Sequence, residues 1–162
     1  HVMLADEAAI RQQDFIRTLA EADRVYILEF RNGAVNLAGH SLLRMHMKYP
    51  ESLSFDTNSV YANLQGIPLR LFYDWVTTLR GGSPVLIPDV GTLAVGYGDR
   101  YELCRSHGTD SIFMFPLRSK NGEFFGVGGI EYCNGNKALT DDQVSRYQQE
   151  FNNLVHCMDI SL

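Results

Sequence analysis

The sequence has no long apolar run, no excess of positive charge and few cysteines. It contains no stretch near the roughly 18 consecutive apolar residues of a membrane span, and no basic segment leading into an apolar one as in a signal peptide. The net charge of -5 disfavours nucleic acid and anionic membranes as partners, because both carry negative charge. We therefore expect no nucleic-acid partner and no membrane contact by this segment.

The three cysteines, Cys104, Cys133 and Cys157, are an odd number and have no CxxC spacing. This usage favours reduced thiols and a cytoplasmic location over a disulfide framework. Cys104 and His107 lie three residues apart, but no second pair of Cys or His completes the set that a zinc site requires. No metal site is therefore predicted.

Size and composition fit one globular domain. With 162 residues, 45% of them hydrophobic and 20% charged, the chain can bury a proper core and is too apolar for a disordered segment. We expect residues 1–162 to form a single domain. Because the chain begins at His1 and ends just after a helical pattern, we also expect it to be a fragment of a longer multidomain protein.

The segment at residues 111–133 predicts a central β-hairpin. Two runs rich in Ile, Phe, Met, Val and Tyr flank Ser119-Lys120-Asn121-Gly122, and Asn-Gly supplies the positive φ angles of a tight turn. Apolar residues do not alternate with polar ones, so both faces of these strands should be covered. Gly126-Val127-Gly128-Gly129 lacks the features of a dinucleotide-binding loop, and mid-strand glycines more often mark close backbone approach.

The first part of the chain predicts a helix followed by strands. An amphipathic helix is expected over residues 6–22, a strand over 23–30 and a turn at 31–33. After an apolar stretch at 34–38, alternation over 42–49 predicts a strand with its odd-numbered residues inward. The inward positions expected on the first helix are Ala9, Ile10, Phe15, Ile16 and Leu19.

The remaining segments complete the pattern. Residues 50–66 are expected to form a long surface connection, 68–80 a helix, 84–87 a short strand and 91–108 a loop with a short helix. Thr140 is the expected N-cap of a last helix that runs to about Met158. The order of helices and strands indicates the α+β class, with helices packed on an antiparallel sheet. The inward residues expected on the two later helices are Leu69, Phe72, Trp75, Val76, Leu79, Val144, Tyr147, Phe151, Leu154 and Val155.

Five phrases at compatible spacing cover nearly the whole chain. They are Asp23-Arg24-Val25-Tyr26-Ile27, Ile67-Pro68 with Trp75, Gly82-Ser83-Pro84-Val85-Leu86-Ile87-Pro88-Asp89-Val90, the hairpin from Asp110-Ser111 through Pro116-Leu117 to Gly126-Val127, and Leu139-Thr140-Asp141-Asp142. In this order they resemble a GAF domain, a sensory module related to PAS domains, of the kind found upstream of histidine kinase, diguanylate cyclase or HD-type phosphodiesterase output domains.

The resemblance implies a central antiparallel sheet of five to six strands, with the N- and C-terminal helices on one face and a ligand pocket on the other. The pocket walls would come from the sheet and from residues 54–79 and 91–107. The resemblance also implies a homodimer formed side by side through the terminal helices, and an output domain in the same chain.

The residues expected around such a pocket combine apolar walls with a few polar groups. The candidates are Met45, Trp75, Tyr97, Tyr101, Phe113 and Glu131. The alternative is that some or all of them belong to the hydrophobic core. The sequence indicates no particular ligand and no cofactor.

The sequence matches the motifs of three more specific kinds of GAF domain only in part. Cyclic-nucleotide-binding relatives carry Asn-Lys followed by an aromatic residue, but Leu139 follows Asn136-Lys137 at that place. Bilin-binding relatives pair a cysteine with a histidine, which Cys104 lacks. Free methionine sulfoxide reductases need thiols upstream of Cys104, and none is present.

A further motif is misleading. Gly128-Gly129-Ile130-Glu131-Tyr132 resembles the signature of diguanylate cyclases, but Ile130 cannot hold a magnesium ion as a carboxylate would. No complete catalytic constellation is present, so we do not expect an enzyme.

The sequence thus predicts a non-catalytic sensory domain in two-component or cyclic-di-nucleotide signalling. It would bind an unidentified small molecule and relay the signal through its terminal helices to a kinase, cyclase or phosphodiesterase. The alternatives are a ligand-free dimerisation or spacer module and an enzyme resembling free methionine sulfoxide reductases. Exposure of Phe113 and Glu131 to a cavity would favour the sensor over the spacer.

Overall fold

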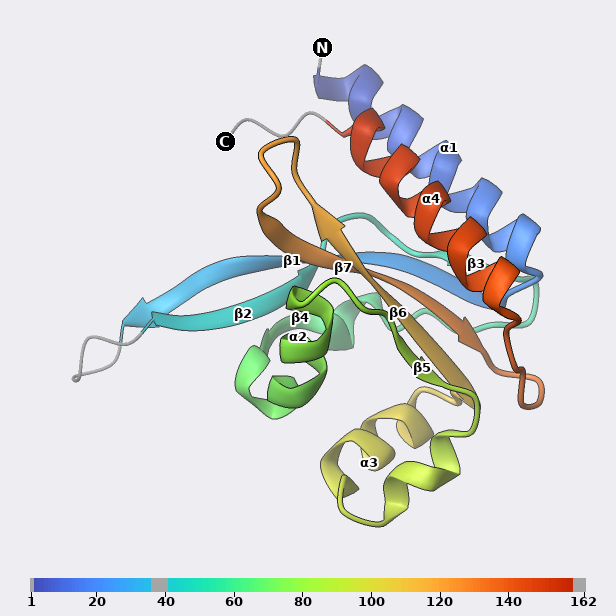
Figure 1. Ribbon diagram of the computed structural model, residues 1–162. Coiled ribbons are helices and arrows are strands. Elements are labelled where there is room, and N and C mark those ends of the chain that lie inside the picture. Colours follow the sequence, from blue (N-terminus) through green and yellow to red (C-terminus); the bar gives the residue numbers. More distant parts are fainter. Residues whose placement is uncertain (1, 36–40, 159–162) are drawn as a thin grey trace.

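The computed structural model describes residues 2–35 and 41–158, and over these it forms a seven-stranded antiparallel sheet with helices on both faces (Figure 1). The strand order is β4-β2-β1-β7-β6-β5, and β3 pairs with β1 outside this path. The strands are β1 (Arg24–Val35), β2 (Ser41–Met47), β3 (Ser52–Leu53), β4 (Gln65–Pro68), β5 (Val85–Ile87), β6 (Ser111–Arg118) and β7 (Phe124–Tyr132). The α+β class is confirmed, with more strands than the five to six expected.

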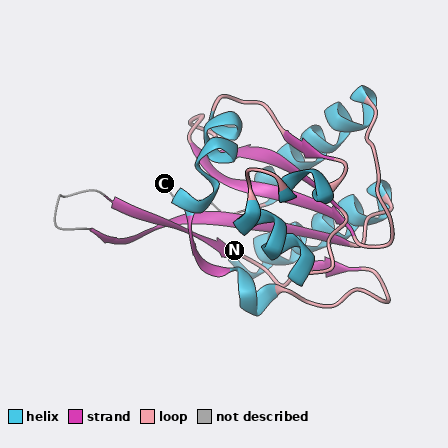
Figure 2. Cartoon of the chain, turned by 90° about the horizontal axis from the view of Figure 1, so that it is seen from below, coloured by secondary structure: helices cyan, strands magenta, loops and turns pink. Residues whose placement is uncertain are grey.

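The long helices lie together on one face of the sheet, as expected, and the short ones on the other. Figure 1 shows α1 and α4 side by side above the sheet, with α2 and α3 below it. Seen from below in Figure 2, the short helices lie in front of the strands. The helices are α1 (Val2–Ala20), α2 (Tyr73–Arg80), α3 (Gly98–Ser106) and α4 (Asp141–Cys157), with 3-10 helices η1 (Tyr61–Leu64), η2 (Leu69–Phe72) and η3 (Val90–Ala94).

The predicted hairpin is present as β6 and β7, and both strands lie inside the sheet. Its turn differs from the prediction. Five residues, 119–123, connect the strands, with a hydrogen bond from the Ser119 amide to the Glu123 carbonyl at 2.9 Å. Only Gly122, at φ 81°, supplies a positive φ angle in this turn, whereas Asn121 does not.

The turn predicted at residues 31–33 is wrong, because β1 continues to Val35. Arg31 pairs with Arg44 and Asn32 with Leu43, so β2 supplies hydrogen bonds where the local sequence favoured a turn. The register shifts after Asn32, as in a β-bulge. Residues 36–38 of the predicted apolar stretch lie outside the described residues.

Alternate side chains of the central strands enter two separate cores. On the face toward α1 and α4, the core includes Ile27, Ile130 and Phe151. On the face toward α2 and α3, it includes Tyr26, Val127 and Met114. Mid-strand glycines permit close packing on each side, since a Cβ atom on Gly128 would strike Phe151 and one on Gly129 would strike Tyr26.

The buried stripe of α1 is narrower than predicted. Ala9 and Ile16 are fully buried and Leu19 is partly buried, but Ile10 and Phe15 are 37% and 45% exposed. Gln13 is buried between them and donates from Nε2 to the Pro50 carbonyl at 2.9 Å. The reason is that α1 packs along one line of positions three and four residues apart, which leaves its flanks in solvent.

The capping and periodicity signals for the later helices predicted them correctly. Thr140 caps α4 with a reciprocal capping box, because its hydroxyl accepts from the Gln143 amide while the Gln143 side chain accepts from the Thr140 amide. Residues 68–80 form η2 and α2, and all five of their expected inward residues are buried. The connection at 50–66 contains β3 and η1 rather than continuous loop. Across the described part of the chain, no helix combines the length and apolar character needed to cross a membrane.

Candidate ligand site

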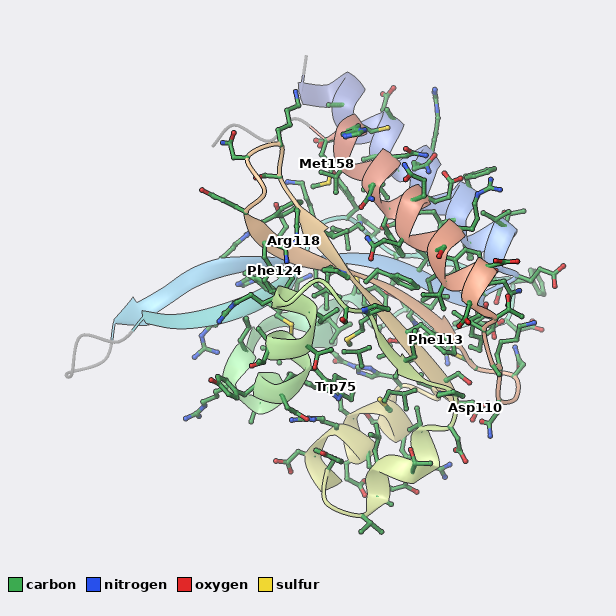
Figure 3. All side chains as sticks on the ribbon, viewed as in Figure 1. Trp75, Asp110, Phe113, Arg118, Phe124 and Met158 are labelled. Atoms are coloured by element: carbon green, nitrogen blue, oxygen red, sulfur yellow. The ribbon has the colours of Figure 1, made fainter. Side chains whose placement is uncertain are left out.

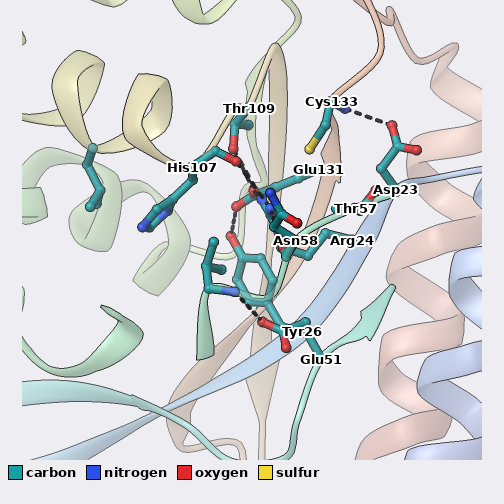
Figure 4. Close-up of polar contacts among 12 residues, drawn as sticks. Asp23, Arg24, Tyr26, Glu51, Thr57, Asn58, His107, Thr109, Glu131 and Cys133 are labelled. Carbon is teal, nitrogen blue, oxygen red and sulfur yellow. Dashed lines mark hydrogen bonds and ion pairs between the residues drawn. The ribbon is translucent and has the colours of Figure 1, made fainter. Parts of the chain in front are cut away.

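A buried polar cluster lies on the α2 and α3 face of the sheet, where β1 and β7 pair (Figure 4). Arg24 is fully buried, and its Nη1 donates to Glu131 Oε1 at 2.5 Å. Thr109 Oγ1 donates to the same carboxylate oxygen at 2.8 Å, and the Tyr26 hydroxyl donates to Oε2. A carboxylate on the apolar floor of this face is thus held by three donors.

The strand register places these groups. Arg24 is the direct cross-strand partner of Glu131, and paired residues share a face of the sheet. Tyr26, two residues along β1, pairs with Gly129. A Cβ atom on Gly129 would lie 2.3 Å from the Tyr26 ring, so only glycine lets the phenol lie flat across β7 and reach Glu131.

Arg24 also ties two loops to the cluster. Its Nη2 donates to the Asn58 carbonyl at 3.0 Å and to the His107 carbonyl at 3.2 Å. Burial opposes its charged form and is the largest single influence on its pKa. Attraction to Glu131 and Cys133, the hydrogen bond to Glu131 and the Tyr26 hydroxyl together outweigh burial, so the pKa of Arg24 is raised. Burial, followed by repulsion from Glu131, raises the pKa of Tyr26 well above its ordinary value, so the hydroxyl stays protonated and donates.

An internal cavity of about 30 Å³ adjoins the cluster. Its polar wall is Glu131, Tyr26, Thr109 and His107, and burial lowers the pKa of His107, which favours the neutral imidazole. This volume holds about one water molecule, whereas ligand pockets usually measure about 300–1,000 Å³. The apolar wall comprises Leu28, Met45, Leu64, Ile67, Phe72, Trp75, Leu103, Cys104, Ile112 and Met114.

An open groove of about 320 Å³ lies immediately outside the cavity, between η2 and α3. Ile67, Phe72 and Leu103 line both the cavity and the groove, so these three side chains form the wall between them. Movement of this wall would join the two volumes into one space of the size typical of ligand pockets.

Arg100 connects α3 to η2 and α2 across the groove. Its guanidinium carbon lies 4.9 Å from the Trp75 ring centre, 4.8 Å from that of Tyr97 and 5.9 Å from that of Phe72. It also forms an ion pair with Asp74, and the hydrogen bond from Arg100 lowers the pKa of that carboxyl. We call this set of contacts the Arg100 latch.

Replacing Arg100 with methionine is expected to loosen α3. Two ring contacts across the groove, with Trp75 and Phe72, would be lost, each worth about 0.5–1 kcal/mol, together with the hydrogen bond from Arg100 Nε to the Leu71 carbonyl. The ion pair adds little because Asp74 is 48% exposed. We therefore expect the melting temperature to fall by about 3–8 °C. Acrylamide should also quench Trp75, the only tryptophan, more efficiently than in the parent protein.

Arg105→Met on the same helix is the matched control, because Arg105 is exposed and its guanidinium carbon lies 6.0 Å from the ring centre of Tyr101, at the limit of a cation–π interaction. Equal quenching in the two variants would show that Arg100 does not close the groove.

The structure brings four of the six candidate residues to this region. Met45, Trp75 and Glu131 line the cavity, and Tyr101 packs against the same core. Tyr97 is 44% exposed and reaches the site only through its contact with Arg100. Phe113 lies in the core beneath α1 and α4, on the opposite face of the sheet from the cavity, and Figure 3 shows it apart from Trp75. We leave Phe113 out of the proposed site.

The thiols near the site are poor nucleophiles. Burial raises the pKa of Cys104, a cavity-wall residue, to about 12, and that of Cys133 to about 11. Among the residues that the structure describes, no three or more His, Cys, Asp or Glu side chains come together to hold a metal ion.

No family model matches this sequence, and no curated protein matches it. Solved structures do match over nearly the whole chain. The GAF3 domain of Slr1393 from Synechocystis sp. PCC6803, in its photoproduct state, covers 93% of this chain and 90% of its own, with 16% identity and a TM-score of 0.72. The chain has the GAF fold.

Other GAF structures agree in the same way. The PixJ GAF domain of Thermosynechococcus elongatus, in its blue-light-absorbing form, covers 94% of this chain and 83% of its own, with 14% identity and a TM-score of 0.74. A domain described as part of a two-component sensor histidine kinase protein from Sinorhizobium meliloti 1021 covers 90% and 85%, with 16% identity and a TM-score of 0.57. At these identities the likeness establishes the fold alone.

Within this GAF fold, sequence reasoning missed Arg24 and Arg100 as residues of the site. Arg24 alternates with Val25 and Ile27, so it shares a strand face with Tyr26, and this period of two was the available signal. Arg100 gave no comparable signal, because its aromatic partners Trp75 and Phe72 are distant in the sequence.

Proposed function

We propose that this GAF domain is a non-catalytic sensory domain of a longer signalling protein, and that it binds a small molecule where the cavity and the groove adjoin. The observation that carries the proposal is a buried carboxylate, Glu131, at the inner end of an apolar cavity that contains Trp75. A spacer would be served as well by apolar side chains at these positions, since a buried ion pair such as Arg24–Glu131 is often no more stabilising than well-packed apolar residues of similar volume.

The chemistry of the walls indicates the ligand class. Glu131 accepts three hydrogen bonds of about four that a carboxylate can take, which leaves room for one donor from a ligand. The remaining cavity wall is mostly apolar, and at the groove Arg100 Nη1 is a buried donor without a partner among the described residues. The ligand expected is small and largely apolar, with a hydrogen-bond donor at one end and an acceptor at the other.

The test uses Trp75 fluorescence together with thermal shift. We would titrate the protein with cyclic nucleotides, haem, amino acids and aromatic acids, and we expect at least one compound to change the Trp75 emission and raise the melting temperature. A ligand at one hundred times its dissociation constant stabilises by about 2.7 kcal/mol, well within detection.

Leu103→Phe fills the wall between cavity and groove and should weaken that binding. Leu86→Phe, on the 41% exposed Leu86 of β5, is the matched control. The proposal fails if no compound in the panel binds, or if binding is equal in the two variants.

A ligand-free spacer is the second candidate, and the small size of the closed cavity favours it. A spacer predicts that no compound in the panel binds and that the protein forms a dimer through α1 and α4. Size-exclusion chromatography with light scattering, using an α1 variant such as Phe15→Glu on its 45% exposed position, would test that dimer.

Signal relay is proposed through α1 and α4, which pack side by side on the face opposite the cavity. A ligand that binds two arrangements of the domain unequally would shift their populations. This shift would change the activity of a kinase, cyclase or phosphodiesterase in the same chain. The two raised cysteine pKa values support a non-catalytic role and disfavour the sulfoxide-reductase alternative. The cytoplasmic location stays a prediction from the unpaired thiols.

A further inference from the structure

A second, larger groove of about 510 Å³ lies between the turn of the β6–β7 hairpin and the last turns of α4. It shares no lining residue with the cavity or with the groove at the Arg100 latch. The ladder between β5 and β6 stops at the pair Val85–Met114, and Pro116 and Arg118 on the following part of β6 line the groove. Figure 3 places Arg118 near this end of the sheet and Met158 beyond the end of α4.

The groove carries positive charge from side chains that make no ion pair among the described residues. Arg118 and Lys120 line it with His156, and no aspartate or glutamate is among its lining residues. None of these three side chains takes part in an ion pair in the described part of the chain, although Arg24, Arg100 and Arg146 all do. In a protein with a net charge of -5, such a concave positive surface concentrates anions locally.

Arg118 is held in place before any ligand arrives. Its Nη1 donates to the Gly122 carbonyl at 3.1 Å, and its Nη2 donates to the Arg80 carbonyl. Both acceptors are neutral, and the guanidinium has five N–H groups, so three remain available with the full positive charge. A cation fixed in this way loses little side-chain entropy on binding.

Amide side chains of α4 complete the wall. Gln148 Nε2 donates to the Pro116 carbonyl and to Asn152 Oδ1, each at 3.1 Å. Because Asn152 Oδ1 accepts this bond, the Nδ2 group of Asn152 is left as a donor. A fixed guanidinium, the exposed ammonium of Lys120 and an amide donor match the several oxygens of a phosphate group.

We propose that this groove is a second ligand site, which binds a small molecule through a phosphate group. The groove volume lies in the usual range for small-molecule pockets. Because its walls belong to the hairpin turn and to α4, an occupant would tie these two elements together at the end of the helix.

Tripolyphosphate is the probe, measured by isothermal titration calorimetry at constant ionic strength set with sodium chloride. We expect saturable binding to the parent protein. Arg118→Gln should raise the dissociation constant about ten-fold, because a charge-assisted contact is lost, and Lys120→Gln should raise it by a smaller factor. Lys120 makes no hydrogen bond among those described, so its variant tests charge without disturbing the fold.

Arg105→Gln is the matched control, because Arg105 is exposed, on α3, and outside this groove. It should leave the dissociation constant unchanged. The proposal is overturned if the parent protein shows no binding at constant ionic strength. It is also overturned if Arg105→Gln weakens binding as much as Arg118→Gln does. Orthophosphate and a nucleoside monophosphate form further arms, and tighter binding of the latter would identify a phosphate ester rather than the free ion as the ligand.

Discussion

Replacing Arg24 with methionine is expected to lower the free energy of unfolding by about 3–5 kcal/mol, the usual cost of removing one partner from a buried ion pair. The variant keeps the side-chain volume but leaves the Glu131 carboxylate, 3% exposed, without its cation. It also removes the hydrogen bonds that hold the loops at Asn58 and His107. Chemical denaturation followed by circular dichroism measures the change.

Two further variants test whether the loss comes from the buried ion pair between Arg24 and Glu131. Arg31→Met, on the same strand, removes an arginine that is 58% exposed and lies 3.6 Å from Glu29, and it should cost less than about 1 kcal/mol. Adding Glu131→Gln to Arg24→Met should recover part of the loss, since a neutral amide needs no cation. Its oxygen can accept from one of the two hydroxyls, Tyr26 or Thr109, while its NH2 group donates to the other. If Arg24→Met were as mild as Arg31→Met, the buried pair would not stabilise the fold.

Local signals in the sequence were sufficient for the parts of the fold that local hydrogen bonds determine. The capping box of Thr140 and the apolar face of residues 68–80 depend on neighbours within four residues, and both are present. The turn signal at Arg31-Asn32-Gly33 was equally local, but pairing with β2 overrode it. Propensity predicts what a segment favours alone, and long-range pairing can reverse that preference.

Phe113 lies in the core beneath α1 and α4 and not at the predicted cavity. The hairpin strands are apolar on both faces, so periodicity alone does not say which side chains point to the cavity. The register decides this. A two-residue turn at Asn121 and Gly122 would pair Ile112 with Glu131, whereas the observed five-residue connection alone would shift the pairing by one residue and put Phe113 and Glu131 on the same face. The register shift between Leu117 and Arg118 restores the pair Ile112–Glu131, so Phe113 and Glu131 lie on opposite faces and only Glu131 meets the cavity.

The same register makes Gly129 the residue on which the polar cluster depends. Gly129→Ala would place a methyl group 2.3 Å from the Tyr26 ring, so the ring must move away from β7 and from Glu131. We expect a loss of about 1–3 kcal/mol in the free energy of unfolding, as for other overpacked cores. Gly98→Ala, where an added Cβ would meet nothing within 4 Å, should change it by less than about 0.5 kcal/mol.

A double-mutant cycle with Tyr26→Leu separates this steric effect from a general loss of backbone freedom. The smaller side chain removes the ring that the added methyl group would strike, so Gly129→Ala should cost much less in the Tyr26→Leu background than in the parent protein. Equal costs in both backgrounds would mean that the glycine serves the strand and not the phenol. In that case the hydrogen bond from Tyr26 to Glu131 would not depend on this close approach.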